Sequence, residues 1–336
     1  MKKHIILFAA LLLLCVSASA REIRLGIIGL DTSHSTAFSK LLNDPVSEDP
    51  YVRRFQVVAA YPYGTMTIES AAKRIPQYIE EVKTYGVEVV TSIAELLDRV
   101  DFVLIETNDG RLHLEQALEV FKAGKGCYID KPLGATLGEV MAIYQVAEQY
   151  GTPVFSSSAL RFSPENVWIR KGAYGPVKGA DVYSPHHPEP THPDFGYYGI
   201  HGVETLFTVM GTGCQEVVRM HTEEGDIVTG RWADGRLGTF RAIVTGPNLY
   251  GGTVIVADKA VPAGGYVGYL PLLHAILDFF ETGIPPVGQE ETLEMFAFMK
   301  ASNMSLERGG RPVSLKEAIQ AGRKDARKIL KTLRRR

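Results

Sequence analysis

The sequence predicts an α/β protein, with an N-terminal Rossmann-type, doubly wound sheet and a C-terminal α+β domain that carries an open antiparallel sheet. In residues 24–157, short apolar runs alternate with helical patterns, as in a parallel sheet that helices cover on both faces. After about Ser158, short strands alternate apolar and polar residues, which is typical of an antiparallel sheet with one exposed face. The expected domains are residues 21–158 and 159–322, followed by a basic tail at 323–336.

The N-terminus is predicted to be a secretory signal that ends at residue 20. Lys2 and Lys3 precede an apolar run from residue 5 to 16, and Ala18-Ser19-Ala20 is a small-residue cleavage pattern. The apolar run is too short to span a bilayer comfortably, and a retained N-terminal anchor is the alternative. The expected location is therefore secreted or periplasmic.

In the first domain, each expected strand is a short, mostly apolar run, and most of the expected helices begin or end at a recognisable signal. Pro62 and Gly64 end the second strand, a capping box from Ser92 to Glu95 opens a helix, and Gly151 ends the last helix. The expected strands are 24–30, 55–61, 87–90, 101–106, 126–130 and 154–157. The expected helices, besides the one that opens at Ser92, are 36–43, 66–85, 112–123 and 137–150.

In the second domain, Ala233-Asp234-Gly235 is predicted to be a hairpin turn between two strands. The expected strands are 177–183, 216–222, 226–232, 236–245 and 252–257. The expected helices are 163–172, 200–210, 270–281 and 292–306. The tail at 323–336 holds eight Lys or Arg and one acid, which favours a solvated basic helix end over contact with a membrane surface or an acidic partner.

The charge balance argues against a nucleic-acid partner. The chain has 36 Lys and Arg against 38 Asp and Glu, and loss of Lys2 and Lys3 with the signal would leave 34 against 38, a net charge of −4. No segment after the signal has the pattern of a stable membrane span.

Lys131 is the central candidate for chemistry. It follows the short apolar strand that ends near Asp130 and precedes Pro132, which favours an extended conformation at Lys131. The ammonium would then lie at the carboxyl edge of the sheet, where open α/β sheets bind ligands. A desolvated lysine there can act as an acid or a base, whereas the simpler interpretation is a surface salt bridge.

Several motifs resemble, in their order and spacing, those of the glucose–fructose oxidoreductase/inositol dehydrogenase (Gfo/Idh/MocA) family. Residues 130–134 (DKPLG) resemble that family's Glu-Lys-Pro block, with Asp for Glu. Residues 107–113 (TNDGRLH) resemble its loop after the fourth strand, and residues 161–164 (RFSP) resemble the opening of its second domain. Gly199-Ile200-His201 followed by Glu204 is similar to its Gly-x-His…Asp helix.

The resemblance implies hydride exchange between NAD(P) and a sugar or polyol, in a homo-oligomer that pairs through the C-terminal sheet. It implies that Lys131 contacts both nicotinamide and substrate, and that His201 transfers the proton or orients the substrate. The expected catalytic residues are Lys131, His201, Tyr197 and Glu204. The expected substrate contacts are Lys131, Arg161, His187 and His201. The expected cofactor contacts are Gly29, Leu30, Asp31, Thr32, Ser33, His34, Tyr61, Thr107, Asn108, His113, Asp130 and Lys131.

The dinucleotide-binding loop departs from the family pattern. A Gly-x-Gly-x-x-Gly fingerprint that starts at Gly29 would have Asp31 and His34 in place of its second and third glycines. A carboxylate at Asp31 would repel a diphosphate unless it points away, and Asp31 is either a ligand residue or a helix N-cap. The second strand ends at Tyr61 without the usual acid for the ribose, so Tyr61 either stacks on adenine or closes the sheet edge.

The predicted catalytic helix also departs from the family. Tyr197 stands four residues before His201, where the family usually has Asp, and Glu204 lies one helical turn beyond His201. We expect Glu204 to orient the imidazole, the alternative being a surface histidine near an acid. His186, His187 and His192 could bind a metal together with His201, Asp194 and Glu204, but their spacing fits no set ligand pattern. No metal site is therefore predicted, and a sugar-contacting or solvated loop is favoured.

The sequence therefore predicts an oxidoreductase that exchanges hydride between a tightly bound NAD(P) and a secondary hydroxyl of a sugar, polyol or glycoside. A second possibility is an NAD-dependent glycosidase or lyase that acts through a transient keto-sugar. A third is a cofactor-free sugar-binding or lyase protein that has lost the dinucleotide, which the altered loop at Asp31 favours.

Overall fold

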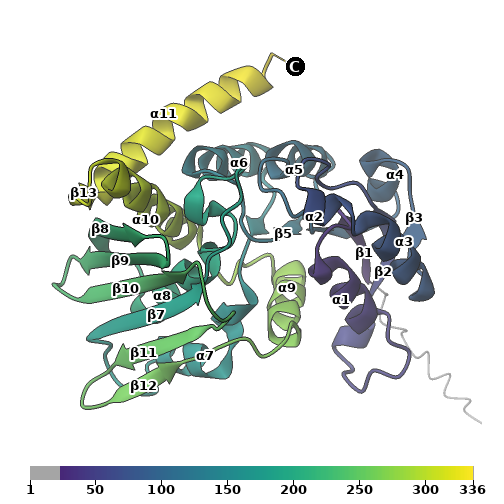
Figure 1. Ribbon diagram of the computed structural model, residues 1–336. Coiled ribbons are helices and arrows are strands. Elements are labelled where there is room, and N and C mark those ends of the chain that lie inside the picture. The colour runs from purple at the N-terminus through teal and green to yellow at the C-terminus, as the bar shows by residue number, and fades with distance from the viewer. Residues whose placement is uncertain (1–22, 336) are drawn as a thin grey trace, which may run out of the picture.

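The computed structural model describes residues 23–335, which form two sheets placed side by side with helices around and between them (Figure 1). The predicted signal at 1–20 lies outside the described residues. None of the helices within residues 23–335 combines the length and the apolar character needed to cross a membrane.

The first sheet has the strand order of a Rossmann fold. Its six described strands are all parallel, and the order reverses between β1 and β4, which creates a crevice at their carboxyl ends. The predicted doubly wound sheet is confirmed. In spatial order the strands are β3 (Glu88–Val89), β2 (Phe55–Tyr61), β1 (Ile23–Ile28), β4 (Phe102–Ile105), β5 (Cys127–Ile129) and β6 (Val154–Phe155).

Helices cover both faces of this sheet. Successive residues of a strand point to opposite faces, and both Ile27 and Ile28 are fully buried, in separate apolar clusters. One face packs against α4 (Ile93–Leu97), α5 (His113–Lys122) and α6 (Leu137–Tyr150), and the other against α1 (Ser33–Leu42) and α3 (Ile75–Thr84). The helix expected at 66–85 is instead divided into α2 (Glu69–Ala72) and α3, because Pro76 lies in the first turn of a helix.

A helix from the second half of the chain completes the second face. Leu272, Leu273 and Ile276 of α9 (Leu270–Thr282) are fully buried in the same cluster as Leu25 of β1 and Phe155 of β6. The segment before α9 therefore lies near the first sheet although it is distant in sequence.

The second sheet is mixed rather than antiparallel. β7 pairs in parallel with β10, whereas the other pairs are antiparallel. The prediction of an all-antiparallel sheet is wrong at this pair, because residues 186–213, including α8 (Ile200–Met210), cross over before β8 begins. In spatial order the strands are β12 (Ala260–Ala263), β11 (Gly251–Ile255), β7 (Gly179–Pro185), β10 (Leu237–Ile243), β9 (Gly225–Trp232), β8 (Cys214–Thr222) and β13 (Val313–Ser314).

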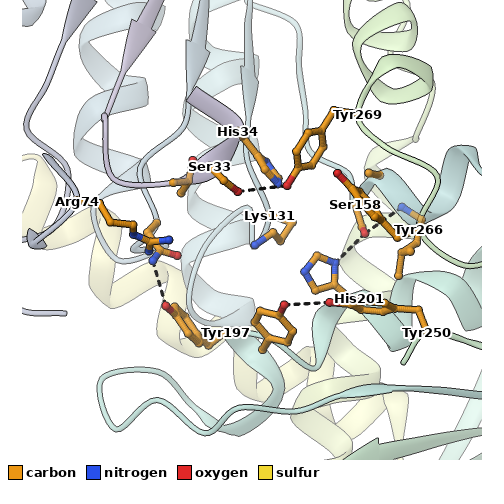
Figure 2. Close-up of a pocket in the computed structure, with 15 residues that line it drawn as sticks. Ser33, His34, Arg74, Lys131, Ser158, Tyr197, His201, Tyr250, Tyr266 and Tyr269 are labelled. Carbon is orange, nitrogen blue, oxygen red and sulfur yellow. Dashed lines mark hydrogen bonds between the residues drawn. The ribbon is translucent and has the colours of Figure 1, made fainter. Parts of the chain in front are cut away.

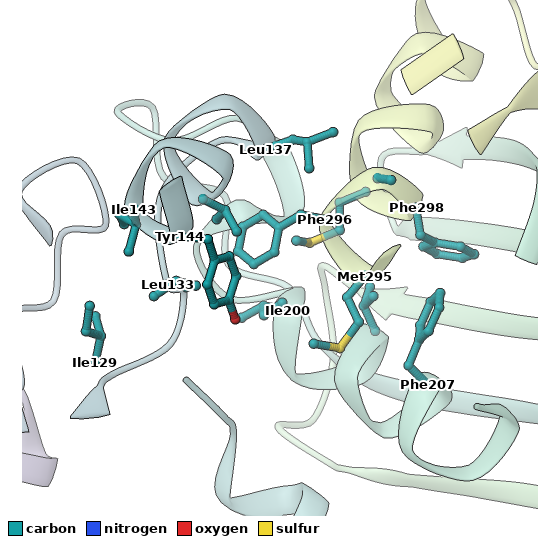
Figure 3. Close-up of a cluster of buried hydrophobic side chains, with 14 of the residues drawn as sticks. Ile129, Leu133, Leu137, Ile143, Tyr144, Ile200, Phe207, Met295, Phe296 and Phe298 are labelled. Carbon is teal, nitrogen blue, oxygen red and sulfur yellow. The ribbon is translucent and has the colours of Figure 1, made fainter. Parts of the chain in front are cut away.

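A continuous apolar core joins the two halves. Figure 3 shows Leu133 and Tyr144, which lie beside and on α6, next to Phe296 of α10 (Gln289–Glu307) and Ile200 of α8. α7 (Pro164–Arg170) packs against α8. Because one cluster spans both halves, the loops at the junction are held in a fixed relation.

The last helix, α11 (Leu315–Leu333), lies along α6 and α10 (Figure 1). It runs without a break through residues 322 and 323, where a separate basic tail was expected to begin. Gly138 on α6 faces Asp325 and Ala326 of α11 closely enough that a Cβ at Gly138 would lie 2.8 Å from the Asp325 Cβ.

Candidate active site

A cavity of about 370 Å³ lies where the carboxyl ends of the first sheet meet the second half of the chain (Figure 2). This volume is within the range of sites for small ligands. The cavity is lined by Thr32, Ser33, His34, Arg74, Asn108, Lys131, Ser158, Ala159, Leu160, Tyr197, Tyr198, His201, Tyr250, Tyr266 and Tyr269. Seven of the residues expected from the sequence thus line one cavity: Thr32, Ser33, His34, Asn108, Lys131, Tyr197 and His201.

Lys131 faces this cavity from the end of β5. The strand ends at Ile129, so Asp130 and Lys131 leave the sheet at its carboxyl edge, and the Lys131–Pro132 peptide is cis. The Lys131 ammonium lies 6.0 Å from the centre of the Tyr198 ring, and Figure 2 shows it near the middle of the lining residues. The ammonium is therefore available to a bound molecule.

His201 lies opposite Lys131, in the first turn of α8. Its Nδ1 is 2.8 Å from the Ser158 hydroxyl, and its ring packs edge-on against Tyr198 and Tyr250. Burial, helped by the positive charge of Lys131, lowers the pKa of His201 well below its usual value. The imidazole is therefore neutral at neutral pH. In the tautomer with hydrogen on Nδ1, Nε2 keeps a free lone pair.

The loop after β1 turns sharply at Gly29, which has a φ of +93° and lies directly against Thr107. The carboxylate of Asp31 is fully buried and accepts hydrogen bonds from the amides of Thr65 (2.7 Å) and Asn108 (3.0 Å). Burial raises the pKa of Asp31 to about 6, although both hydrogen bonds lower it. Asp31 is not part of the cavity wall, so its carboxylate is turned away from the cavity.

The N-terminus of α1 faces the cavity without a side-chain cap. Thr32 is the N-cap residue, but its hydroxyl donates to the Glu106 carbonyl oxygen instead of accepting from an amide of α1. The first amides of α1 therefore have no side-chain partner, and such amides bind phosphate. Arg74 adds a positive charge to the same cavity from the junction of α2 and α3.

Two buried carboxyl groups lie behind His34. Asp130 Oδ1 is 2.9 Å from His34 Nδ1, and Glu106 Oε2 is 3.7 Å from the same nitrogen. Burial and the neighbouring charge of Asp130 raise the pKa of Glu106 well above its usual value. Burial opposes ionisation of Asp130 too, but His34 and Lys131 prevail and lower its pKa to about 2.

The structure corrects the expected roles of Glu204 and Arg161. Glu204 does not pair with His201, because its carboxylate accepts hydrogen bonds from Arg161 Nε (2.8 Å), the Ser158 amide (2.7 Å) and the Ser157 hydroxyl. Arg161 is 5% exposed and also binds Glu291, at 2.8 Å. Neither residue lines the cavity, so both act through Ser158 and the packing rather than by direct contact.

Other expected contacts lie outside the cavity wall. His113 is fully buried and its ring nitrogens lie 2.8 Å from the Thr107 carbonyl oxygen and 3.2 Å from that of Leu133, so it ties two loops together and cannot touch a ligand. Gly29, Leu30 and Thr107 lie beneath the loop surface. Tyr61 packs against Tyr63 at the end of β2, away from the cavity.

The histidines of the loop after β7 do not converge. His187 is exposed and its ring lies 4.7 Å from that of Tyr198. His186 packs on Phe195, whereas His192 Nε2 lies 3.4 Å from Asp109 Oδ1. Contact between His187 and substrate stays a prediction.

Eight wall residues were not anticipated from the sequence: Arg74, Ser158, Ala159, Leu160, Tyr198, Tyr250, Tyr266 and Tyr269. Tyr198 adjoins the predicted Tyr197 and could have been included on position alone. Tyr250, Tyr266 and Tyr269 belong to segments around β11, β12 and α9 that no local pattern connects with Lys131. The packing of α9 on the first sheet brings Tyr266 and Tyr269 to the cavity, whereas Tyr250 lies beside Tyr198.

Comparisons with known proteins agree with this geometry. Residues 23–158 match the Gfo/Idh/MocA family model, described as an oxidoreductase family with an NAD-binding Rossmann fold. No curated protein matches the chain.

Solved structures share the fold over most of the chain. One is a probable dehydrogenase from Thermotoga maritima, with 19% identity, a TM-score of 0.71, and coverage of 88% of this chain and 100% of that one. Another is the apo scyllo-inositol dehydrogenase from Lactobacillus casei, with 15% identity, a TM-score of 0.71, and coverage of 88% and 99%. The WlbA dehydrogenase from Bordetella pertussis, solved with NADH and UDP-GlcNAcA, has 15% identity, a TM-score of 0.67, and coverage of 88% and 98%.

Proposed function

Because residues 23–158 match the model of an oxidoreductase family with an NAD-binding Rossmann fold, we propose that the chain is a Gfo/Idh/MocA oxidoreductase that exchanges hydride between NAD(P) and a secondary hydroxyl of a sugar, polyol or glycoside. One observation carries the proposal. Lys131 and a neutral His201 face the same cavity as the uncapped N-terminus of α1.

The residues present fit a dinucleotide even though the glycine fingerprint is altered. Asp31 would repel a diphosphate if its carboxylate pointed outward, but it is bonded to Thr65 and Asn108 behind the wall. The amides at the start of α1 and the guanidinium of Arg74 supply the positive potential that a diphosphate needs. Bound NAD(P) supplies the hydride acceptor.

The protein side of the reaction is proton transfer and orientation. Neutral His201 accepts the hydroxyl proton of the substrate at Nε2, while the Ser158 hydroxyl holds the ring at Nδ1. The Lys131 ammonium donates a hydrogen bond to the same oxygen and stabilises the negative charge that develops there. Glu204 positions Ser158 rather than touching the substrate, because its carboxylate accepts a hydrogen bond from the Ser158 amide.

The aromatic wall supports a sugar-like substrate. Tyr198, Tyr250, Tyr266 and Tyr269 line the half of the cavity that the second part of the chain provides, and the hydroxyls of Tyr198 and Tyr250 lie 2.9 Å apart. Aromatic faces pack against the apolar faces of sugar rings, and phenol hydroxyls bind their oxygens. Two of the structural neighbours are named for an inositol or contain a nucleotide sugar, which agrees with this substrate class.

A secreted or periplasmic location fits a tightly held cofactor, since free nicotinamide nucleotides are cytosolic molecules.

We also propose a homo-oligomer formed through the second sheet, because Met220, Leu237 and Ile255 on three of its strands are 73%, 53% and 42% exposed. Size-exclusion chromatography with light scattering would show a mass twice that of the chain or more.

The proposal is tested by denaturing the purified protein and analysing the released small molecules by mass spectrometry and absorbance. We expect about one equivalent of NAD or NADP. Release of none, together with failure of added NAD⁺ and NADP⁺ to bind, would favour a cofactor-free sugar-binding or lyase protein instead.

Transient oxidation of a sugar hydroxyl is compatible with the same residues, and it would acidify a neighbouring C–H and allow a glycoside to be cleaved. Product analysis decides between these reactions, since net oxidation leaves a keto-sugar with reduced nicotinamide. Cleavage leaves the nicotinamide oxidised at the end of each cycle.

A further inference from the structure

We propose that His34, Glu106 and Asp130 form a binding site for a divalent first-row metal ion, such as Zn²⁺ or Mn²⁺, beside the catalytic cavity. Within residues 23–335 this is the single group of three His, Cys, Asp or Glu residues whose candidate ligand atoms converge, and all three are buried. This site could not be predicted from the sequence, because no short motif connects its residues. Glu106 and Asp130 follow β4 and β5, and His34 lies on α1.

The spacing of the donor atoms suits a metal. Ligands at about 2.1 Å from a tetrahedral or octahedral ion lie about 3.0–3.4 Å apart. His34 Nδ1 is 2.9 Å from Asp130 Oδ1 and 3.7 Å from Glu106 Oε2, and all three donor atoms lie within 4.8 Å of one another. The distance from His34 to Asp130 is thus already close to this range, whereas Glu106 would have to move inward to complete the coordination.

The carboxylates also lack other partners. Among the described residues, neither oxygen of Glu106 has a hydrogen bond, although its side chain is fully buried, and Asp130 Oδ2 has none either. Tyr128 donates only a long bond of 3.4 Å to Asp130 Oδ1. Buried carboxylates are normally paired or bound to a metal, so three unpartnered oxygens beside one imidazole point to an absent ligand.

The ammonium of the nearest lysine acts on these carboxyl groups only through its charge. Lys131 follows Asp130 in the chain, but its ammonium is directed toward the Tyr198 ring. With both carboxyl groups ionised, Glu106 and Asp130 would together balance the charge of a divalent ion. One nitrogen and two oxygen donors suit Mn²⁺, Fe²⁺ or Zn²⁺ better than Mg²⁺ or Ca²⁺, which prefer oxygen ligands alone.

The proposed metal site lies next to the catalytic cavity. His34 forms part of the cavity wall, whereas Glu106 and Asp130 lie behind it. Figure 2 shows the His34 ring beside Lys131 and Tyr269. Because His34 Nδ1 is a buried atom, an ion held there would lie behind the wall, next to the cavity.

The test measures metal binding directly, without substrate or nicotinamide, so its failure leaves the proposed hydride transfer untouched. Untagged protein is treated with a chelator, and Zn²⁺ and Mn²⁺ are titrated by calorimetry while the melting temperature is recorded. We expect one equivalent to bind and to raise the melting temperature, with Mg²⁺ much weaker.

Glu106→Gln is the decisive variant because it keeps the shape and removes one ligand charge. We expect it to fold and to bind the ion at least about tenfold more weakly. His221→Ala, which removes a half-exposed histidine bonded to Asp226 in the second sheet, is the matched control and should bind like the wild type. Absence of binding to the wild type at about 1 mM ion, or equal binding by Glu106→Gln, would overturn the proposal.

Discussion

The carboxylate of Asp31 accepts hydrogen bonds from the amides of Thr65 and Asn108, and burial raises its pKa to about 6. A carboxyl group whose pKa is raised on folding favours the protonated form in the folded state. Its contribution to stability is therefore complete below pH 4 and is lost as the pH rises through about 6. Ionisation of Asp31 thus has a cost at neutral pH.

We predict that Asp31→Asn removes this cost. The free energy of unfolding of the variant minus that of the wild type should increase by up to roughly 3 kcal/mol from pH 4 to pH 8. Urea unfolding at both pH values measures it, with the exposed Asp44→Asn as the control. An equal difference from the wild type at both pH values would show that Asp31 titrates as in the unfolded chain.

His201 is predicted to act as a base whose pKa is lowered by burial and by the charges of Lys131 and His34, whereas Asp130 raises it slightly. A base must be unprotonated to accept the substrate proton, and a lowered pKa keeps it unprotonated in mild acid. The acidic limb of kcat/KM that belongs to His201 should therefore lie below about pH 6.5.

The variant His201→Asn should lower kcat by about 10²–10⁴-fold and abolish that limb. Thr205→Ala is a suitable control, because Thr205 lies on the same helix and its hydroxyl only bonds the His201 carbonyl oxygen. A His201→Asn profile that keeps the limb would assign it to another group.

On the scale of secondary-structure elements, Arg161 links three segments. From the 3₁₀ turn Ala159–Phe162 it binds Glu204 of α8 and Glu291 of α10, each at 2.8 Å. We predict that Arg161→Met lowers the free energy of unfolding by about 3–5 kcal/mol, because it leaves Glu204 buried without its cation. Denaturant unfolding measures the loss. Arg308→Met, which breaks an exposed pair with Glu317, should cause no measurable change.

The contact between α6 and α11 depends on Gly138. Alanine is the better helix former by about 1 kcal/mol, but its methyl group at this position would collide with Asp325 and the Ala326 backbone. We predict that Gly138→Ala displaces α11, so that amides of α11 exchange hydrogen faster while those of β4 and β5 do not. Glu148→Ala, on the exposed face of α6, is the control, and unchanged exchange in α11 would contradict the tight contact.

The sequence predicts elements well where local signals are strong. The expected ranges 55–61, 137–150 and 200–210 coincide with β2, α6 and α8, since each has clear apolar periodicity and an end signal such as Pro62 or Gly151. The prediction fails where the pairing or packing of an element depends on a partner that is distant in the sequence. β7 and β10 pair in parallel although neither sequence differs from an antiparallel strand, and α11 depends on α6 for its packing.

The residues of the candidate site also differ in whether local sequence signals or distant partners determine their positions. Lys131, His201 and Ser33 could be predicted because strand ends and helix starts converge at one edge of a Rossmann sheet. The partner of Glu204 could not be predicted. Whether Glu204 pairs with His201 or with Arg161 depends on the direction of side chains across the 3₁₀ turn and α8. Tyr266 and Tyr269 reach the cavity only because α9 returns to the first sheet.

At the scale of the whole molecule, the account depends on a cavity that neither half of the chain forms alone. The first sheet contributes Lys131 and the N-terminus of α1, and the second half contributes His201 and the tyrosines. A bound nicotinamide and a sugar would meet between the two halves, which one continuous apolar core holds in a fixed relation.

The most direct test is to follow the absorbance of bound nicotinamide at about 340 nm while candidate sugars and polyols are added to the purified protein, since hydride transfer creates or removes this band. The wild type should show a change with at least one sugar or polyol. Lys131→Met should retain the cofactor and slow the change by about 10²-fold or more, whereas Lys122→Met, on the exposed side of α5, should not. A change that proceeds at the wild-type rate in Lys131→Met would contradict the account.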